Sequence, residues 1–328
     1  MTSPSLRAGR REFLATLAAC ATPLVQAQQD AATNTPLRLV VPYTPGTGMD
    51  SIARQVAPRL DERLKRPVLV DNKPGAAGNI GTLEVVRSAP DGNTLLVSAN
   101  TVVMNRALYP KAGFDPLKDL DGVTLAAWGQ LLLVTSRKSG ITTAQELIAR
   151  AKAAPGKLNY GSPGSGTPHH LAMELVKKQA GIDLTHVPYG GTGPAVTDLL
   201  GGTLDVMFLP IHVALQHVKS GALNALAISS EKPNPVLPDV PPLRQLGLGD
   251  LDVEMWYGIM APHGVPAPII DRLNTELRSI LALPDLRAVF ETQGMTPASS
   301  TPAELHDRMV RDAARWAEVI RVQKITAG

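Results

Sequence analysis

Short apolar runs alternate along the chain with longer segments whose apolar residues recur at helical spacing. Between residues 50 and 64, Ile52, Val56 and Leu60 form one apolar stripe, which predicts an amphipathic helix capped by Asp50 or Ser51. Alternating strands and helices predict a parallel sheet with crossover helices. In this first part of the chain the predicted strands are 37–41, 67–70 and 94–97, and a second helix is predicted over 82–88.

A second unit of the same kind begins at Leu131. Strands are predicted at 131–134, 157–160, 184–187 and 205–208, and helices at 143–153, at 168–180 and from Pro194 to about 201. A strand over 223–229 is expected to return the chain to the first unit. A Pro-rich connection at 233–242, a strand at 256–261 and helices at 267–282 and 302–321 then follow.

This order of elements predicts an α/β protein of two lobes, with the second lobe inserted into the first. The expected boundaries are 37–130 for the first part of lobe 1, 131–228 for lobe 2 and 229–328 for the second part of lobe 1. A chain of 328 residues is long enough for two compact lobes. Its 44% of hydrophobic and 19% of charged residues are typical of a soluble globular protein.

The N-terminus has the parts of an export signal peptide. Three arginines precede an apolar stretch at 13–25, and a small-residue cleavage site ends at Ala27. We therefore predict a signal peptide over 1–27, a polar tether over 28–36 and a periplasmic mature protein. Arg10-Arg11 resembles a twin-arginine signal. The alternative is a lipoprotein box at 17–20, which would make Cys20 a lipidated membrane anchor.

Charge and cysteine content exclude several functions for the mature chain. Removal of the leader, with three bases and one acid, lowers the formal net charge from +3 to +1. No basic stripe interleaved with aromatic residues is present, so no nucleic-acid partner is expected. Cys20 is the only cysteine. A mature chain without it has no disulfide, thiol nucleophile or thiolate metal site.

The Gly-rich loops do not match the known catalytic or nucleotide-binding motifs. The run 161–166 fails the G-x-S-x-G pattern, no P-loop lysine follows the glycines, and 45–50 is not G-x-G-x-x-G. His169 and His170 are adjacent and would point about 100° apart on a helix, so they do not chelate a metal together. We therefore predict no catalytic residue, no metal site and no cofactor.

These loops nevertheless share one physical type. Each follows a strand, is rich in Gly, Ser and Thr, and leads into a helix. Glycine lets the backbone turn its N–H groups inward, and a helix N-terminus adds unsatisfied donors and a partial positive charge. Because ligands of open α/β sheets bind at the carboxyl ends of strands, several such loops facing one crevice predict an anion site.

Motifs in a fixed order extend this interpretation over 37–319. They are Val40–Gly46 with Asp50, then 70–81 (VDNKPGAAGNIG), 89–95 (APDGNTL), 155–162 (PGKLNYGS) with 164–167 and His170-Leu171, 187–191 (VPYGG), 201–202 with 205–207, and 256–258 (WYG). Together they resemble the substrate-binding receptors of the tripartite tricarboxylate transporters, the Bug receptor family. The resemblance implies a type II periplasmic-binding-protein fold, in which two α/β lobes close on a ligand like a Venus flytrap.

The resemblance also implies the ligand and the residues that hold it. The expected ligand is a small mono- or dicarboxylate, which a monomeric receptor would deliver to membrane permease subunits without catalysis. The implied ligand-binding residues are Tyr43, Gly46, Thr47, Gly48, Met49, Ser98, Asn100, Ser162, Gly166, Thr167, Tyr189, Gly190, Thr192 and Asp205. Asp205 is equally well interpreted as a structural acid at a strand start.

Two departures from the family pattern bear on ligand choice. Thr47 stands where a second glycine is usual, and His169 stands where a small residue is commoner. Two alternative functions remain open at this point. One is a sensor subunit that presents the liganded receptor to a signalling partner. The other is a small-ester hydrolase on the same fold, for which the sequence offers no nucleophile–base pattern.

Overall fold

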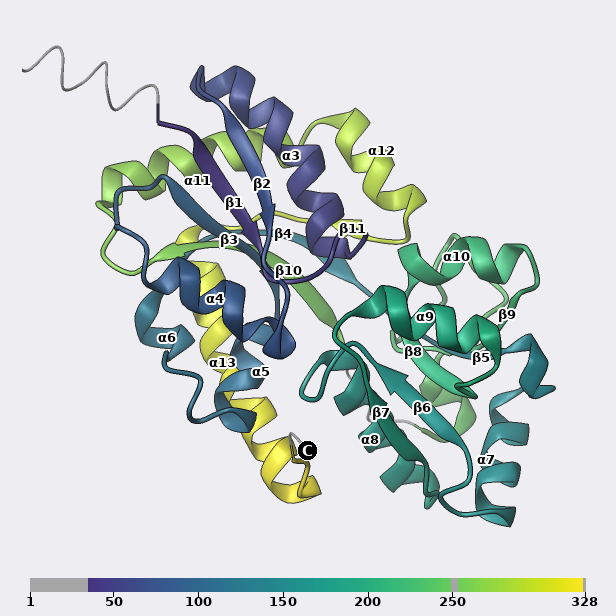
Figure 1. Ribbon diagram of the computed structural model, residues 1–328. Helices are drawn as coiled ribbons and strands as arrows, with labels where there is room; N and C mark the ends of the chain where they lie inside the picture. Colours follow the sequence, from purple (N-terminus) through teal and green to yellow (C-terminus); the bar gives the residue numbers. More distant parts are fainter. Residues whose placement is uncertain (1–34, 249–252, 327–328) are drawn as a thin grey trace, which may run out of the picture.

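The chain folds into two α/β lobes, each built on its own β-sheet (Figure 1). The computed structural model describes residues 35–248 and 253–326. The predicted signal peptide 1–27, Cys20 and most of the tether 28–36 lie outside the described residues. Within the described residues no helix is long and apolar enough to cross a membrane.

The first lobe contains a six-stranded sheet of order β11-β4-β10-β3-β1-β2. Strands β1, β2 and β3 are parallel, whereas β10 runs antiparallel to both β3 and β4. The strands are β1 (Leu37–Val41), β2 (Val68–Asn72), β3 (Thr94–Ala99), β4 (Leu120–Gly129), β10 (Met255–Pro262) and β11 (Thr296–Pro297). The helices are α3 (Gly48–Leu64), α4 (Asn79–Val86), α5 (Thr101–Leu108), α6 (Pro116–Asp119), α11 (Ala267–Leu281), α12 (Pro284–Thr292) and α13 (Pro302–Gln323).

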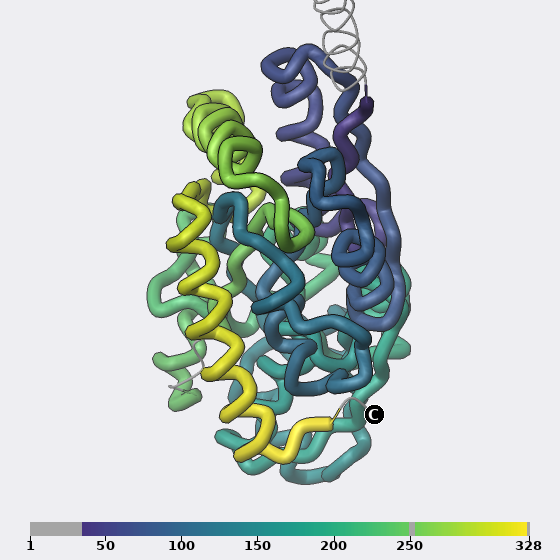
Figure 2. The backbone as a smooth tube through the Cα atoms, turned by 90° about the vertical axis from the view of Figure 1, so that its left-hand side faces the viewer, coloured from purple at the N-terminus to yellow at the C-terminus, as the bar shows by residue number. Residues whose placement is uncertain are grey.

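Both faces of this sheet are covered, which explains why its strands are continuous apolar runs. In β1, Leu39 packs with Ile52 of α3 on one face, whereas Val40 packs with Trp256 and Leu305 on the other. Helices α3 and α11 cover the first face, and α4, α5 and α13 cover the second (Figure 1). Helix α13 then continues along the edge of the molecule (Figure 2) and contacts α8 of the other lobe.

The second lobe contains a five-stranded sheet of order β7-β6-β8-β5-β9. Strands β6, β7 and β8 are parallel, and β5 runs antiparallel to β8 and β9. Helices α7 and α8 pack on one face, and α9 and α10 on the other. The elements are β5 (Leu131–Ser136), α7 (Ala144–Ala153), β6 (Asn159–Ser162), α8 (Pro168–Ala180), β7 (Thr185–Pro188), α9 (Thr192–Gly201), β8 (Val206–Pro210), α10 (Ile211–Lys219) and β9 (Leu223–Ile228).

The backbone passes between the lobes at Gln130 and again after β9. Asn234, on the second connection, donates to Gln130 Oε1 at 2.8 Å and to the Gly294 carbonyl at 3.3 Å, so the two connections lie side by side. β9 pairs with β5, so the strand itself belongs to the second sheet; the expectation that it returns the chain to lobe 1 was wrong. We propose that the lobes divide at residues 130 and 228. The proposal is supported by the strands, because those between these positions all belong to the second sheet.

Among the residues that the structure describes, six of these strands and helices were not predicted from the sequence, including the short elements α6 and β11. The longer ones are β4, α5, α10 and α12. The largest omission is β4, a ten-residue strand that lies between β10 and the short edge strand β11.

Candidate functional site

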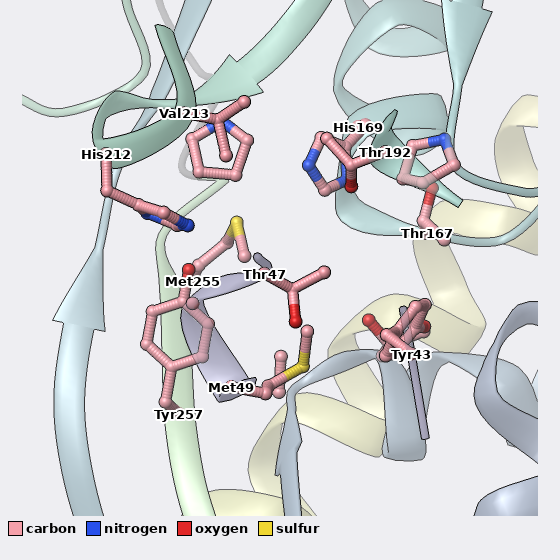
Figure 3. Close-up of a pocket in the computed structure, with 15 residues that line it drawn as sticks. Tyr43, Thr47, Met49, Thr167, His169, Thr192, His212, Val213, Met255 and Tyr257 are labelled. Atoms are coloured by element: carbon pink, nitrogen blue, oxygen red, sulfur yellow. The ribbon is translucent and has the colours of Figure 1, made fainter. Parts of the chain in front are cut away.

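A cavity lies between the two lobes, at the carboxyl ends of their parallel strands (Figure 3). Its empty space is about 380 Å³ when the open solvent at its mouth is counted. The lining residues are Tyr43, Thr47, Gly48, Met49, Ala99, Thr101, Pro163, Thr167, His169, Thr192, Pro210, His212, Val213, Met255 and Tyr257. Because both lobes contribute, the cavity exists only when the lobes are closed.

Five helices begin at this cavity. Thr101 starts α5, Thr192 starts α9, and Gly48 starts α3. Thr167 and Pro210 are the N-cap residues of α8 and α10. The first N–H groups of a helix have no partner inside it, and the helix dipole makes this end partly positive. Five such ends around one space favour a bound anion.

The buried carboxylate of Asp50 orders the loop that follows β1. Thr47 caps α3 by accepting the Asp50 N–H at 3.4 Å, and Asp50 accepts the Gly46 N–H at 3.0 Å. Burial alone would raise the pKa of Asp50, but hydrogen bonds from Arg54, Gly46 and Asn72 outweigh it and lower the pKa below its usual value. Asp50 therefore stays ionised and orders the loop that presents Thr47.

The loop after β6 is ordered by its own hydroxyls. Thr167 donates to the Gly164 carbonyl at 2.8 Å, and the Gly166 N–H donates to His170 Nδ1 at 3.1 Å. Gly166 has φ +86°, a left-handed conformation that favours glycine. Thr167 lines the cavity, whereas Ser162 and Gly166 lie behind it and support the loop.

The structure places Ser162 next to a histidine, which bears on the hydrolase alternative. Ser162 Oγ lies 2.7 Å from His186 Nε2, and the His186 ring stacks on His170 with centroids 4.2 Å apart. Ser162 is fully buried, and neither Ser162 nor His186 lines the cavity. A substrate in the cavity would not reach this pair, so its role is to support the loop.

Four other predicted residues, on the loop after β7 and at the end of β3, do not line this cavity. Tyr189 and Gly190 line a neighbouring cavity that shares Tyr43 and Pro163 with the first. Ser98 is buried in β3, and Asn100 donates to the Glu254 carbonyl at 3.0 Å, so both build the wall from behind.

Asp205 does not belong to the cavity. It precedes β8 and accepts the Asn159 N–H at 2.8 Å, at the amino ends of two parallel strands whose carboxyl ends form the site. The structure therefore favours the strand-start interpretation over a role in the cleft.

Eight of the residues that line the cavity were not predicted from the sequence. They are Ala99, Thr101, Pro163, Pro210, His212, Val213, Met255 and Tyr257, and His169 was expected only near the rim of the cleft. Thr101 follows β3 after one residue and Pro210 ends β8, so the rule that the carboxyl ends of parallel strands form the site could have found them. Met255 and Tyr257 lie on an antiparallel strand and carry no such signal.

Among the residues that the structure describes, no lysine, arginine, aspartate or glutamate lines the cavity. Its polar groups are hydroxyls of Tyr43, Tyr257 and threonines, the rings of His169 and His212, and backbone N–H groups. In residues 35–248 and 253–326 no three His, Cys, Asp or Glu side chains are grouped so that they could hold a metal ion. An anion would thus be held by dipoles and hydrogen bonds.

The chain matches the family model for the tripartite tricarboxylate transporter family receptor over residues 52–325. BugT of Bordetella pertussis is 35% identical, over 87% of this chain and 88% of BugT. The solved periplasmic binding protein BugD is 29% identical, with a TM-score of 0.85 over 89% of this chain and 98% of BugD.

Two further solved structures contain ligands. Rpa4515 of R. palustris, solved with adipate, is 29% identical with a TM-score of 0.86, over 89% of this chain and 98% of Rpa4515. MatC of Rhodopseudomonas palustris, solved with bound malate, is 29% identical with a TM-score of 0.81, over 87% of this chain and 98% of MatC.

These similarities confirm the family, the two-lobed fold and the solute-binding function expected from the sequence. Proteins of this family bind solutes and do not convert them, so the chain is a receptor and not an enzyme. The family match, the near-complete coverage of the relatives and the cavity between the two lobes all indicate a solute-binding receptor. The chain belongs to the receptors of the tripartite tricarboxylate transporter family, which are periplasmic solute-binding proteins.

Proposed function

We propose that this receptor captures a small mono- or dicarboxylate and delivers it to a membrane permease. The observation that carries the proposal is the convergence of five helix N-termini on one cavity without a basic side chain. The adipate and malate bound by two structural neighbours are dicarboxylates, which supports the same ligand class.

The residues proposed to contact the carboxylate are those of the predicted set that line the cavity. Thr47, Thr167 and Thr192 offer hydroxyls, and Tyr43, Gly48 and Met49 complete the wall of lobe 1. We assign Gly46, Ser98, Asn100, Ser162, Gly166, Tyr189 and Gly190 to the support of these loops.

A thermal-shift screen of the purified protein against mono-, di- and tricarboxylates and amino acids tests the ligand class. A ligand at a hundredfold excess over its dissociation constant stabilises the folded state by about 2.7 kcal/mol. Thr192→Val should weaken the response to the best carboxylate. Thr197→Val is the matched control, since Thr197 lies on the outer side of α9 and bonds to the Gly193 carbonyl. A protein that responds to amino acids and to no simple carboxylate would contradict the proposal.

To deliver its ligand, the receptor must be recognised by the permease in its closed, ligand-bound form. Ligand binding favours the closed lobes by population shift, and we propose that the permease subunits dock on the closed monomer. Cross-linking in membranes, with and without ligand, should capture the permease only when ligand is present. Capture of a signalling protein in place of the permease would favour the sensor alternative.

The proposed export route can be checked on the same protein. Cleavage near Ala27 leaves a mature N-terminus at about Gln28, whereas lipidation leaves Cys20 as the first residue. Mass spectrometry of the mature protein distinguishes the two masses.

A further inference from the structure

Three side chains that line the cavity carry polar atoms without a hydrogen-bond partner among the residues that the structure describes. They are both ring nitrogens of His169, Nε2 of His212 and the hydroxyl of Tyr257, all buried. His169 is 6% exposed and Tyr257 is 1% exposed. Buried polar groups in folded proteins are almost always hydrogen-bonded, so unpaired polar atoms gathered in one cavity indicate a ligand group that pairs with them.

These residues, here called the imidazole wall (His169, His212 and Tyr257), come from three separate elements. His169 lies in the first turn of α8, His212 in the first turn of α10, and Tyr257 on β10. Their polar ends point into the cavity in Figure 3. A Cβ on Gly48 would lie 2.7 Å from the Tyr257 hydroxyl and 3.0 Å from His212 Cε1, so the wall reaches the N-terminus of α3.

The chemistry of the wall differs from that of the threonine loops. Phenol and imidazole both donate hydrogen bonds, and imidazole can also take up a proton and become a cation. The apolar side chains Met49, Val213 and Met255 lie beside the wall. A ligand that uses both regions therefore has two hydrogen-bond-accepting ends joined by a short apolar chain.

Resting on the carboxylate-receptor function proposed above, we propose that the imidazole wall binds a second acidic group of the ligand, so that the receptor selects dicarboxylates over monocarboxylates. One carboxylate lies against the helix N-termini and threonine hydroxyls. The other accepts hydrogen bonds from Tyr257 and the two imidazoles.

The wall also links ligand capture to proton uptake. Burial lowers the pKa of His169 to about 3, with the nearby His212 adding to the effect, and burial lowers the pKa of His212 to about 4. Both rings are thus neutral at pH 7 before the ligand binds. A carboxylate beside them favours the protonated ring and raises its pKa in the complex.

The sign of the pH dependence follows from this linkage. Since the complex binds the proton more tightly than the free receptor, affinity rises as pH falls, by up to about tenfold per pH unit. This dependence ends above the pKa of the imidazole in the complex. The other titratable side chains that line the cavity in the described part of the chain are Tyr43 and Tyr257, whose pKa values are raised by burial, so both stay neutral.

Isothermal titration calorimetry tests the proposal with succinate, glutarate and adipate and with their monomethyl esters as probes. Each ester keeps one carboxylate and the chain but loses the second charge. We expect the best diacid to bind about tenfold or more tighter than its ester, as expected for loss of a charged hydrogen bond. Titrations in two buffers of different ionisation enthalpy should show proton uptake with the diacid and none with the ester.

The double variant His169→Gln/His212→Gln keeps hydrogen-bond donors but cannot titrate at these positions. It should reduce the diacid preference to a few-fold or less and abolish proton uptake. A cooperative urea-unfolding transition like that of the wild type shows separately that the variant is folded. His217→Gln is the matched control, since His217 lies on the same helix α10 and does not line the cavity.

The outcomes separate this inference from the proposed function. Equal affinity for diacid and ester, or a preference that the double variant retains together with its proton uptake, would overturn the role of the imidazole wall while leaving the carboxylate receptor intact. Failure of every diacid and every ester to bind would instead overturn the proposed function, and the inference with it.

Discussion

The hydroxyl of Tyr109, just after α5 in the first lobe, donates a 2.7 Å hydrogen bond to the backbone carbonyl of Ser165 in the second lobe. The contact is supported at the next residue, where a Cβ on Gly166 would lie 2.7 Å from Leu108 Cδ1. The end of α5 and the loop after β6 therefore meet only when the lobes are closed.

Tyr109→Phe removes this bond and keeps the ring. Because one neutral hydrogen bond contributes about 1 kcal/mol, we expect the ratio of closed to open forms to fall about fivefold. Ligand should dissociate correspondingly faster, as measured by stopped-flow fluorescence. Ser165→Ala is the control, since the acceptor is the backbone carbonyl and survives the substitution. Equal dissociation rates for Tyr109→Phe and the wild type would show that the bond does not hold the lobes together.

The elements that the sequence predicted well are those with a strong local signal. The run Leu37–Val41 is apolar at every position but Arg38 and forms β1, since both faces of the sheet are covered. β4 has no such signal. Gly122 and Gly129 interrupt it, and its pairing with β10 shifts register twice, so the alternation of a half-buried strand is lost.

Two missed helices differ in their cause. In α10, Ile211, Ala214, Leu215 and Val218 recur at helical spacing, so the signal was present in the sequence. In α5 the first positions are uniformly buried, and a short apolar run of this kind cannot be distinguished from a strand by periodicity.

The candidate site was predictable where it follows parallel strands. Thr47, Thr167 and Thr192 were assigned from loops of that kind, and all three line the cavity. Tyr257 was not, because β10 runs antiparallel and brings its amino end to the same edge. The direction of β10 is set by long-range pairing, which no local pattern encodes. His212 was missed together with the helix on which it lies.

Gly48 provides a test of the closed geometry at the start of α3. A Cβ there would lie 2.7 Å from Cζ and the hydroxyl of Tyr257, a separation that real Cβ atoms do not show. Gly48→Ala should therefore displace the Tyr257 ring or the loop and weaken ligand binding about tenfold or more, since close overlap in a packed site costs about 1–3 kcal/mol. Gly193→Ala is the matched control on α9, because its Cβ would meet nothing within 4 Å. Isothermal titration calorimetry measures the ligand affinities of the two variants. Equal affinities for Gly48→Ala and Gly193→Ala would contradict the close packing of Gly48 against Tyr257.

A buried hydrogen bond holds α13 to the sheet of the first lobe. Trp256 Nε1 donates to Asp312 Oδ2 at 2.6 Å, and both residues are buried. Asp312→Ala leaves the indole N–H without this acceptor and should lower the free energy of unfolding by about 1–3 kcal/mol. Neither residue lines the cavity, so ligand affinity should not change. Urea denaturation with the exposed Asp307→Ala on the same helix as control measures the difference. An unchanged midpoint for Asp312→Ala would show that the bond is energetically neutral.

The buried histidines predict that the protein loses stability in mild acid. Burial is the largest cause that lowers the pKa of each ring, to about 3 for His169 and His186 and to about 4 for His170 and His212. In the unfolded chain these rings titrate near pH 6.5. The unfolded state therefore binds more protons between these values, and stability that is complete above about pH 6.5 declines as pH falls toward 4.

Each fully buried ring contributes at most about 1.4 kcal/mol per pH unit to this decline. His170→Asn places an acceptor where Nδ1 receives the Gly166 N–H, but it cannot titrate, so the decline between pH 6.5 and 4.5 should be shallower by up to one proton. His263→Gln is the control, because this exposed ring has a pKa raised by Asp121 and contributes stability that is lost as pH rises. Its replacement should not make the decline shallower. Denaturant unfolding of the ligand-free protein at pH 7, 6 and 5 gives the slopes, and a flat profile for the wild type would mean that the imidazoles are protonated in the folded state.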